Sequence, residues 1–154
     1  MELKILIFLN VLVYSVIVSQ SFMYMIALRN VQENMGAGFY IELRKLLDRN
    51  FLRKFKFVVY TALLLSCLLM LAALFQSSGL FLAGTVLAFA GLLTDVLLAV
   101  KGNMPINRII NSWTLETFPV KWVDYRSKWL YWFSWRQFAN ISGFIALLIA
   151  AIFN

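Results

Sequence analysis

Histidine is absent from this chain of 154 residues, cysteine occurs once, and charged residues make up only 14%. The lack of histidine excludes zinc or haem sites built on imidazole, as well as Ser-His-Asp and Cys-His catalysis. The single cysteine, Cys67, excludes an internal disulfide. The scarcity of charge excludes an ordinary soluble globule, because such domains carry charge on roughly a quarter of their residues.

Apolar residues take the place of the missing charge. The chain is 62% hydrophobic and 16% aromatic, and its mean hydropathy is +0.81. A helix that crosses the hydrocarbon core needs about 20 mostly apolar residues. Four runs meet this requirement, at about 5–28, 55–75, 80–100 and 130–153. No repeat, low-complexity tract or linker separates them, so we expect a single integral membrane domain over 1–154, folded as an all-α four-helix transmembrane bundle.

The first run has an alternative interpretation as a secretory signal, because Ser19-Gln20-Ser21 follows an apolar stretch in the manner of a cleavage site. However, the residues before this stretch include one lysine and one glutamate, Lys4 and Glu2, so they lack the positive charge of a signal peptide. The apolar character also continues through 22–28. We therefore expect the first span to be retained.

The basic residues predict the orientation. Thirteen of the fourteen Lys and Arg residues fall in 29–56 and 101–136, whereas the opposite side holds only Lys4 and the turn 76–79 carries no charge. The positive-inside rule then places both long loops in the cytoplasm and both termini outside, in a plasma membrane that we take to be bacterial inner membrane. The partner of the +7 net charge is expected to be anionic lipid headgroups at the cytoplasmic face. No nucleic-acid motif accompanies the charge, so nucleic acid is not expected to bind.

Two segments between the spans have helical patterns. Residues 37–51 form an amphipathic helix. Its apolar face is predicted to hold Phe39, Tyr40, Leu43, Leu46, Leu47 and Phe51, and its polar face Glu42, Arg44, Lys45, Asp48 and Arg49. This helix either lies in the headgroup plane or continues into the second span. A short loop helix is expected from Asn103, as its N-cap, to about Trp113, and the last helix should begin near 120 or 121.

Asp95 is an ionisable residue inside the third apolar run, where charge is costly and marks function by default. It ends a stripe of small residues at helical spacing, Gly84, Ala88 and Gly91. Such a stripe lets helices approach closely, so Asp95 should face the bundle. Arg136 lies at a comparable depth in the fourth run, and we expect the two to form an ion pair. Such a pair has either a structural or a functional role, and the residues favour neither.

A polar and aromatic pocket is predicted around this pair. Gln20 and Tyr24 share one face of the first span, four residues apart. We expect them to line the pocket together with Asp95, Arg136 and Asn140, with walls formed by Trp129, Trp132 and Phe133. An apolar cavity with a few convergent polar groups is typical of small-molecule sites. The alternative is that these polar side chains only hold the helices together.

Short motifs follow one another in the second half of the chain: Asn103-Met104-Pro105-Ile106-Asn107, then Trp113, Trp122, Arg126, Trp129 and Arg136, before an apolar terminal helix. This pattern resembles the signature of the anthrone-oxygenase-like family of small four-helix membrane proteins. The resemblance is best over 80–154, and over 1–79 only the placement of the spans matches. Most bacterial members have no assigned function, whereas fungal members are implicated in oxygenating anthrones to anthraquinones without an evident metal or flavin.

The resemblance implies a lipophilic aromatic substrate that enters from the membrane, loses a proton to a base and reacts with oxygen as a carbanion. Asn107, Trp129 and Arg136 belong to the shared pattern, and the pocket residues Asp95 and Tyr24 join them as candidates for catalysis. Asp95 is the expected base and Arg136 the group that stabilises an enolate-like anion. No metal ion or cofactor is expected.

Two functions from different classes remain open at this stage. The first is a membrane enzyme or binder for a lipophilic small molecule, as the aromatic and polar face of the last span indicates. The second is a non-enzymatic accessory subunit of a larger membrane complex, for which the small-residue stripe of the third span and the helix 37–51 are the motivation. A transporter is a weaker third choice, because no inverted repeat or broken span is present.

Overall fold

A computed structural model describes residues 2–76 and 78–153, apart from the side chain of Leu52. Most of these residues are helical, with no strand among them. Four continuous helices, Leu3–Asn34, Ala37–Ala73, Gly79–Ser112 and Trp122–Ile152, are long and apolar enough to cross a membrane. The predicted all-α four-helix bundle is therefore confirmed, and the helices are those of an integral membrane protein. Ser77, in the uncharged turn, lies outside the described residues.

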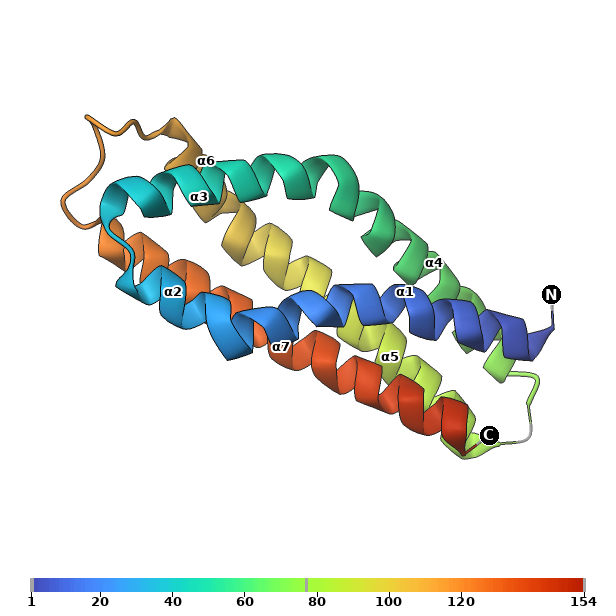
Figure 1. The fold of residues 1–154 in the computed structure, drawn as a ribbon. Helices are drawn as coiled ribbons and strands as arrows, with labels where there is room; N and C mark the ends of the chain where they lie inside the picture. Colours follow the sequence, from blue (N-terminus) through green and yellow to red (C-terminus); the bar gives the residue numbers. More distant parts are fainter. Residues whose placement is uncertain (1, 77, 154) are drawn as a thin grey trace.

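The helices form an up-and-down bundle with two distinct ends (Figure 1). Its elements are α1 (Leu3–Met23), α2 (Arg29–Asn34), α3 (Ala37–Asn50), α4 (Lys56–Ala73), α5 (Gly79–Leu98), α6 (Met104–Ser112) and α7 (Trp122–Ile152). The two termini lie with the α4–α5 turn at one end, called here the terminal end. The α2–α3 turn and the loop 113–121 lie at the opposite end, called here the basic end because it carries α2, α3 and α6 with their lysines and arginines.

Three of the four long helices contain a π-helical turn of five residues. Tyr24–Leu28 joins α1 to α2, Phe51–Phe55 joins α3 to α4, and Ala99–Asn103 joins α5 to α6. A π turn widens the helix and shifts the side chains that follow it, and such turns occur frequently at functional sites. α7 is assigned as regular α-helix from Trp122 to Ile152, so it forms the uninterrupted member of the bundle.

Small residues bring α5 and α7 into close contact toward the terminal end. A Cβ added at Gly84 would lie 2.6 Å from the Cβ of Ala150 and 2.8 Å from the carbonyl oxygen of Ala146. Gly91 faces Gly143 in the same way. The predicted small-residue stripe is thus occupied by a helix of the same chain. Since lipid gives no hydrophobic drive for helix association, this close van der Waals packing is what holds the pair together.

One of the predicted segment boundaries was wrong. Asn103 does not cap a separate helix, because its backbone is helical and its side chain donates to the carbonyl oxygen of Trp129 at 2.9 Å. The third span therefore continues through a π turn into α6 without a break. The last helix begins at Trp122 with Lys121 as its N-cap, close to the predicted start.

The faces of the helix 37–51 also differ from the prediction. This segment, α3, continues into α4, and it packs against α6. Phe39, placed on the apolar face, is 76% exposed, and Leu46 is also exposed, whereas Arg44, placed on the polar face, is buried. The physical reason is that α3 packs against polar side chains of α6, so its own polar residues turn inward.

Candidate functional site

A cavity of about 340 Å³ lies among the four long helices, on the basic side of the close-packed seam. Seven of the nine predicted site residues line it: Gln20, Tyr24, Asp95, Asn107, Trp129, Phe133 and Arg136. This volume is near the lower end of the roughly 300–1,000 Å³ that is usual for small-molecule pockets. The cavity is thus large enough for a small aromatic molecule.

Each of the three π turns contributes residues to the lining of this cavity. Tyr24 comes from the first, Phe51 and Phe55 from the second, and Ala99, Val100 and Asn103 from the third. Away from the cavity, the same helices pack as regular α-helices. The departures from α-helical geometry therefore coincide with the cavity, which is the arrangement expected when local backbone geometry serves a site.

The predicted ion pair is present at one end of the cavity. Arg136 donates through Nε to Oδ1 of Asp95 at 2.6 Å, and Asp95 is only 3% exposed. The arginine also donates to Oδ1 of Asn103 at 3.5 Å. A charge alone in the bilayer would be unstable by several kcal/mol, so each partner accounts for the presence of the other.

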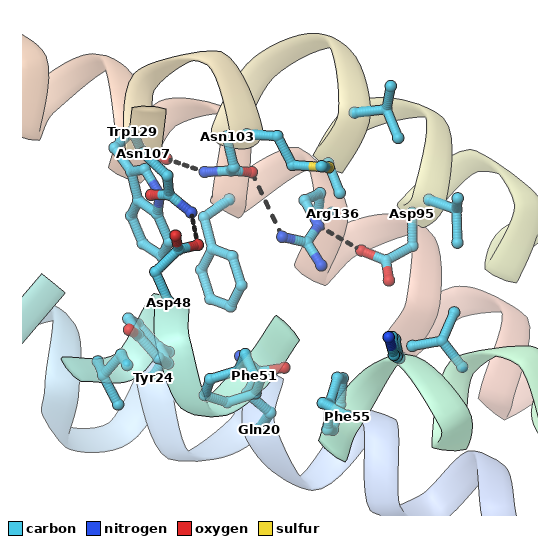
Figure 2. A pocket seen from close by; sticks show the side chains of 18 of the residues that line it. Gln20, Tyr24, Asp48, Phe51, Phe55, Asp95, Asn103, Asn107, Trp129 and Arg136 are labelled. Carbon is cyan, nitrogen blue, oxygen red and sulfur yellow. Dashed lines mark hydrogen bonds and ion pairs between the residues drawn. The ribbon is translucent and has the colours of Figure 1, made fainter. Parts of the chain in front are cut away.

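A hydrogen-bonded network continues from this pair to α3, along one wall of the cavity. Asn103 donates to the carbonyl oxygen of Trp129, and the indole Nε1 of Trp129 donates to Oδ1 of Asn107 at 2.9 Å. Asn107 in turn donates to a carboxylate oxygen of Asp48 at 2.7 Å. Figure 2 shows these polar side chains in one row, with Tyr24, Phe51 and Phe55 on the opposite wall.

Arg44 enters this network from α3. Its guanidinium donates to Oδ1 of Asn107 at 3.0 Å and to the Tyr24 hydroxyl at 3.3 Å, and it stacks 3.7 Å from the centre of the Trp129 ring. In α3, which precedes the second span, burial lowers the pKa of Arg44 below its usual value, and the nearby Tyr24, Tyr40 and Asp48 act in the opposite direction. Cation–π stacking and neutral acceptors thus surround a buried positive charge.

The apolar part of the lining is aromatic. Trp129 and Phe133 stack with ring centres 4.9 Å apart, and Tyr24 lies 4.5 Å from Phe133. Phe51 and Phe55 meet edge to face at 4.9 Å. Flat rings on both walls favour a flat, apolar ligand, and the polar row beside them gives such a ligand a defined orientation.

Two predicted site residues lie outside the cavity lining. Trp132 packs against the backbone of Gly102, where an added Cβ would overlap its ring. Asn140 accepts a hydrogen bond from Ser21 at 2.9 Å and so joins α7 to α1. The helical wheel places Trp132 and Asn140 on the same face of α7 as the lining residues, but it does not show which neighbour each side chain contacts.

Thirteen of the twenty lining residues were not predicted as site residues, among them Arg44, Asp48, Phe51, Phe55 and Asn103. For Asp48 the sequence does contain a signal, the spacing of Asn107 and Asn111 four residues apart on α6. Both asparagines donate to the Asp48 carboxylate at 2.7 Å. Two amides at this spacing can hold one carboxylate of a neighbouring helix. The two phenylalanines have no comparable signal, since their inward direction depends on the π turn.

The chain was compared with protein-family models, curated proteins and solved structures, and none of them matches. The candidate site therefore stands on its geometry.

Proposed function

We propose that this protein binds a lipophilic aromatic small molecule in the cavity between its four helices. The proposal rests on one observation: the cavity has two walls of different chemistry. One wall is a hydrogen-bonded row that ends in the Asp95–Arg136 ion pair, and the other is a set of aromatic rings from the π turns. Helix packing alone requires neither a cavity nor aromatic rings directed into it.

The bilayer is the proposed source of the ligand. A second hollow of about 240 Å³ lies beside the cavity and is lined by Asn50, Phe51, Lys54, Phe55 and Val58. Phe51 and Phe55 line both spaces, so the two spaces meet at these residues. A rotation of either ring would join the spaces and admit an apolar molecule from the side, without passage through water.

The test is to purify the protein in a mild nonionic detergent, extract it with organic solvent and identify small molecules by mass spectrometry. Ala99→Leu fills the cavity, and Ala83→Leu adds the same side chain at an exposed position of α5. We expect an aromatic molecule with the wild type and with Ala83→Leu, and at least a tenfold smaller amount with Ala99→Leu. Equal amounts in all three proteins, or none in the wild type, would overturn the proposal.

The resemblance to anthrone oxygenases extends this proposal to a reaction. Asp95 would take a proton from an acidic methylene of the ligand through the carboxylate oxygen that does not bind Arg136. The carbanion would give electrons to O₂ and form a C–O bond, and the resulting hydroperoxide would lose water to leave a ketone. One O₂ is consumed for each ketone and water formed, and Arg136 would stabilise the intermediate enolate.

Oxygen uptake with an anthrone tests this extension. One O₂ should disappear for each quinone formed, and Asp95→Asn should lower the rate at least a hundredfold. Asp124→Asn, at an exposed carboxylate of α7, is the matched control and should leave the rate unchanged. If the wild type takes up no oxygen above the rate in buffer, the reaction is excluded, while the extraction experiment still decides on binding.

The accessory-subunit hypothesis loses one of the two features that motivated it, because the small-residue stripe of α5 contacts α7 of the same chain. The helix α3 packs on α6 with one face, while Phe39 and Leu46 on its other face are exposed. We retain the proposed orientation, with the basic end in the cytoplasm and in contact with anionic lipid headgroups. In a Cys67→Ser background, Gln76→Cys should react with a membrane-impermeant maleimide in intact cells and Thr117→Cys should not; the reverse pattern would contradict this orientation.

A further inference from the structure

The cavity contains a buried cation, Arg44, that no carboxylate of the described residues contacts directly. Arg44 is 5% exposed, and among the described residues no carboxylate oxygen lies within 4.0 Å of its guanidinium nitrogens. Its Nε is buried without a hydrogen-bond partner there. Burial of a charge is unfavourable by several kcal/mol unless a counter-charge or a full set of hydrogen bonds offsets it.

The two carboxylates that line the cavity already have partners. Asp95 holds Arg136 at 2.6 Å, and Asp48 accepts hydrogen bonds from Asn107 and Asn111, both at 2.7 Å. The lining as a whole contains three cationic residues, Arg44, Lys56 and Arg136, against these two acids. Lys56 is exposed, and the other two cations and two acids balance in charge; of these two cations, Arg44 has no carboxylate oxygen within 4.0 Å among the described residues.

The Tyr24 hydroxyl adds a donor beside this charge. It accepts from Arg44 at 3.3 Å and from Gln32 at 3.0 Å, so both of its lone pairs are used. Its own proton has no acceptor among the hydrogen bonds of the described residues. A phenolic proton next to a guanidinium favours an anionic oxygen as the missing acceptor.

We propose that the ligand is an organic acid, with an apolar aromatic body and one carboxylate or acidic phenol whose anionic oxygen sits beside Arg44 and Tyr24. This inference rests on the proposed binding function and specifies the class of ligand. The aromatic body occupies the space between Trp129 and the phenylalanines of the second π turn, and it extends toward the Asp95–Arg136 pair. The acid supplies a counter-charge in direct contact with Arg44, which no carboxylate of the described residues does.

Two probes that share a naphthalene body test the inference, one with an anionic and one with a neutral oxygen group: 2-naphthoate and 2-naphthalenemethanol, titrated calorimetrically against the protein in a nonionic detergent. The key variant is Arg44→Gln, which keeps a donor for Tyr24 and Asn107 but removes the charge. Arg49→Gln is the control, because Arg49 is exposed on the same helix. The ratio of the two affinities, compared between variants, cancels the partition of each probe into detergent.

We expect Arg44→Gln to lower the affinity for naphthoate at least tenfold and to change the affinity for the alcohol less than twofold, because only the acid loses a charge-assisted hydrogen bond. Arg49→Gln should leave both affinities unchanged. Equal changes for the two probes, or none, would overturn the acid as the ligand class and leave the binding function intact. If neither probe binds the wild type, the inference and the proposed function both fail.

Arg44→Lys guards against a variant that does not fold, since lysine restores the charge without the planar fork. If Arg44→Gln binds neither probe, Arg44→Lys decides: a retained preference for naphthoate supports the inference, and the loss of that preference overturns it.

Discussion

The two halves of this bundle use the same helices in opposite ways. Toward the terminal end, glycine and alanine allow α5 and α7 to touch, and the helices stay regular. Toward the basic end, aromatic and charged side chains keep the helices apart, three of them contain π turns, and a cavity remains. The difference indicates that side-chain size, rather than span length, decides where a membrane bundle closes and where it stays open.

The comparison also separates two kinds of polar contact. In the terminal half, Ser66 donates to Asn10 at 2.9 Å and Tyr14 donates to the carbonyl oxygen of Ala88 at 3.3 Å, and each contact joins just two helices. At the basic end, a network from Asp48 to Asp95 joins α3, α6, α7 and α5. Isolated contacts strengthen packing, whereas a network around a cavity holds several groups in fixed positions toward a ligand.

The largest effect should come from the charge pair of the basic half. Arg136→Ala leaves Asp95 buried without its partner, and we expect the free energy of unfolding to fall by about 4 kcal/mol. Titration with SDS in mixed micelles measures it. The double variant Asp95→Asn with Arg136→Gln removes both charges and should recover at least half of the loss; no recovery would mean that the pair is not the source of the effect.

A larger side chain should distinguish the closed half from the open half. Ala88→Leu forces a bulky group into the α5–α7 seam and should lower the free energy of unfolding by about 3 kcal/mol. Ala99→Leu, farther along the same long helix, places the same group in the cavity and should change it by less than about 0.5 kcal/mol. Similar losses for both would show that the cavity is not open space.

The smallest possible addition, a methyl group, makes the same comparison more sharply. Gly84→Ala meets the Cβ and the backbone of α7 and should destabilise by about 2 kcal/mol in the SDS titration. Gly38→Ala meets only the end of the Leu115 side chain at 3.6 Å, and it should be neutral or stabilising by up to about 1 kcal/mol because alanine favours helix. A tolerated Gly84→Ala would contradict the close contact.

Within the basic half, two asparagines that bind the same carboxylate should differ. Asn107→Ala removes contacts to Asp48, Arg44 and Trp129 together, and we expect a loss of about 1.5 kcal/mol. Asn111→Ala removes only one exposed hydrogen bond to Asp48 and should lower the stability by a few tenths of a kcal/mol. Equal losses would mean that Asn107 does not connect the network.

The sequence predicted the features that depend on composition and period. The four spans follow from apolar runs, and the Asp95–Arg136 pair follows from the cost of charge in lipid together with comparable depth. The inward direction of Arg44 could not be predicted, because it depends on the polar side chains of α6 against which α3 packs, and the direction of Phe55 depends on a π turn that no residue pattern marks. Trp132 shows the same limit, since its contact with Gly102 depends on the turn Ala99–Asn103.

The most direct test of the central claim, that the open half of the bundle is a ligand site, is a crystal structure grown in lipidic mesophase without an added ligand. The account predicts continuous, flat electron density between Trp129 and Phe55, with one end beside Arg44, that no detergent or lipid chain explains. A cavity that has collapsed, with the Phe51 and Phe55 rings packed directly on Trp129, would contradict it.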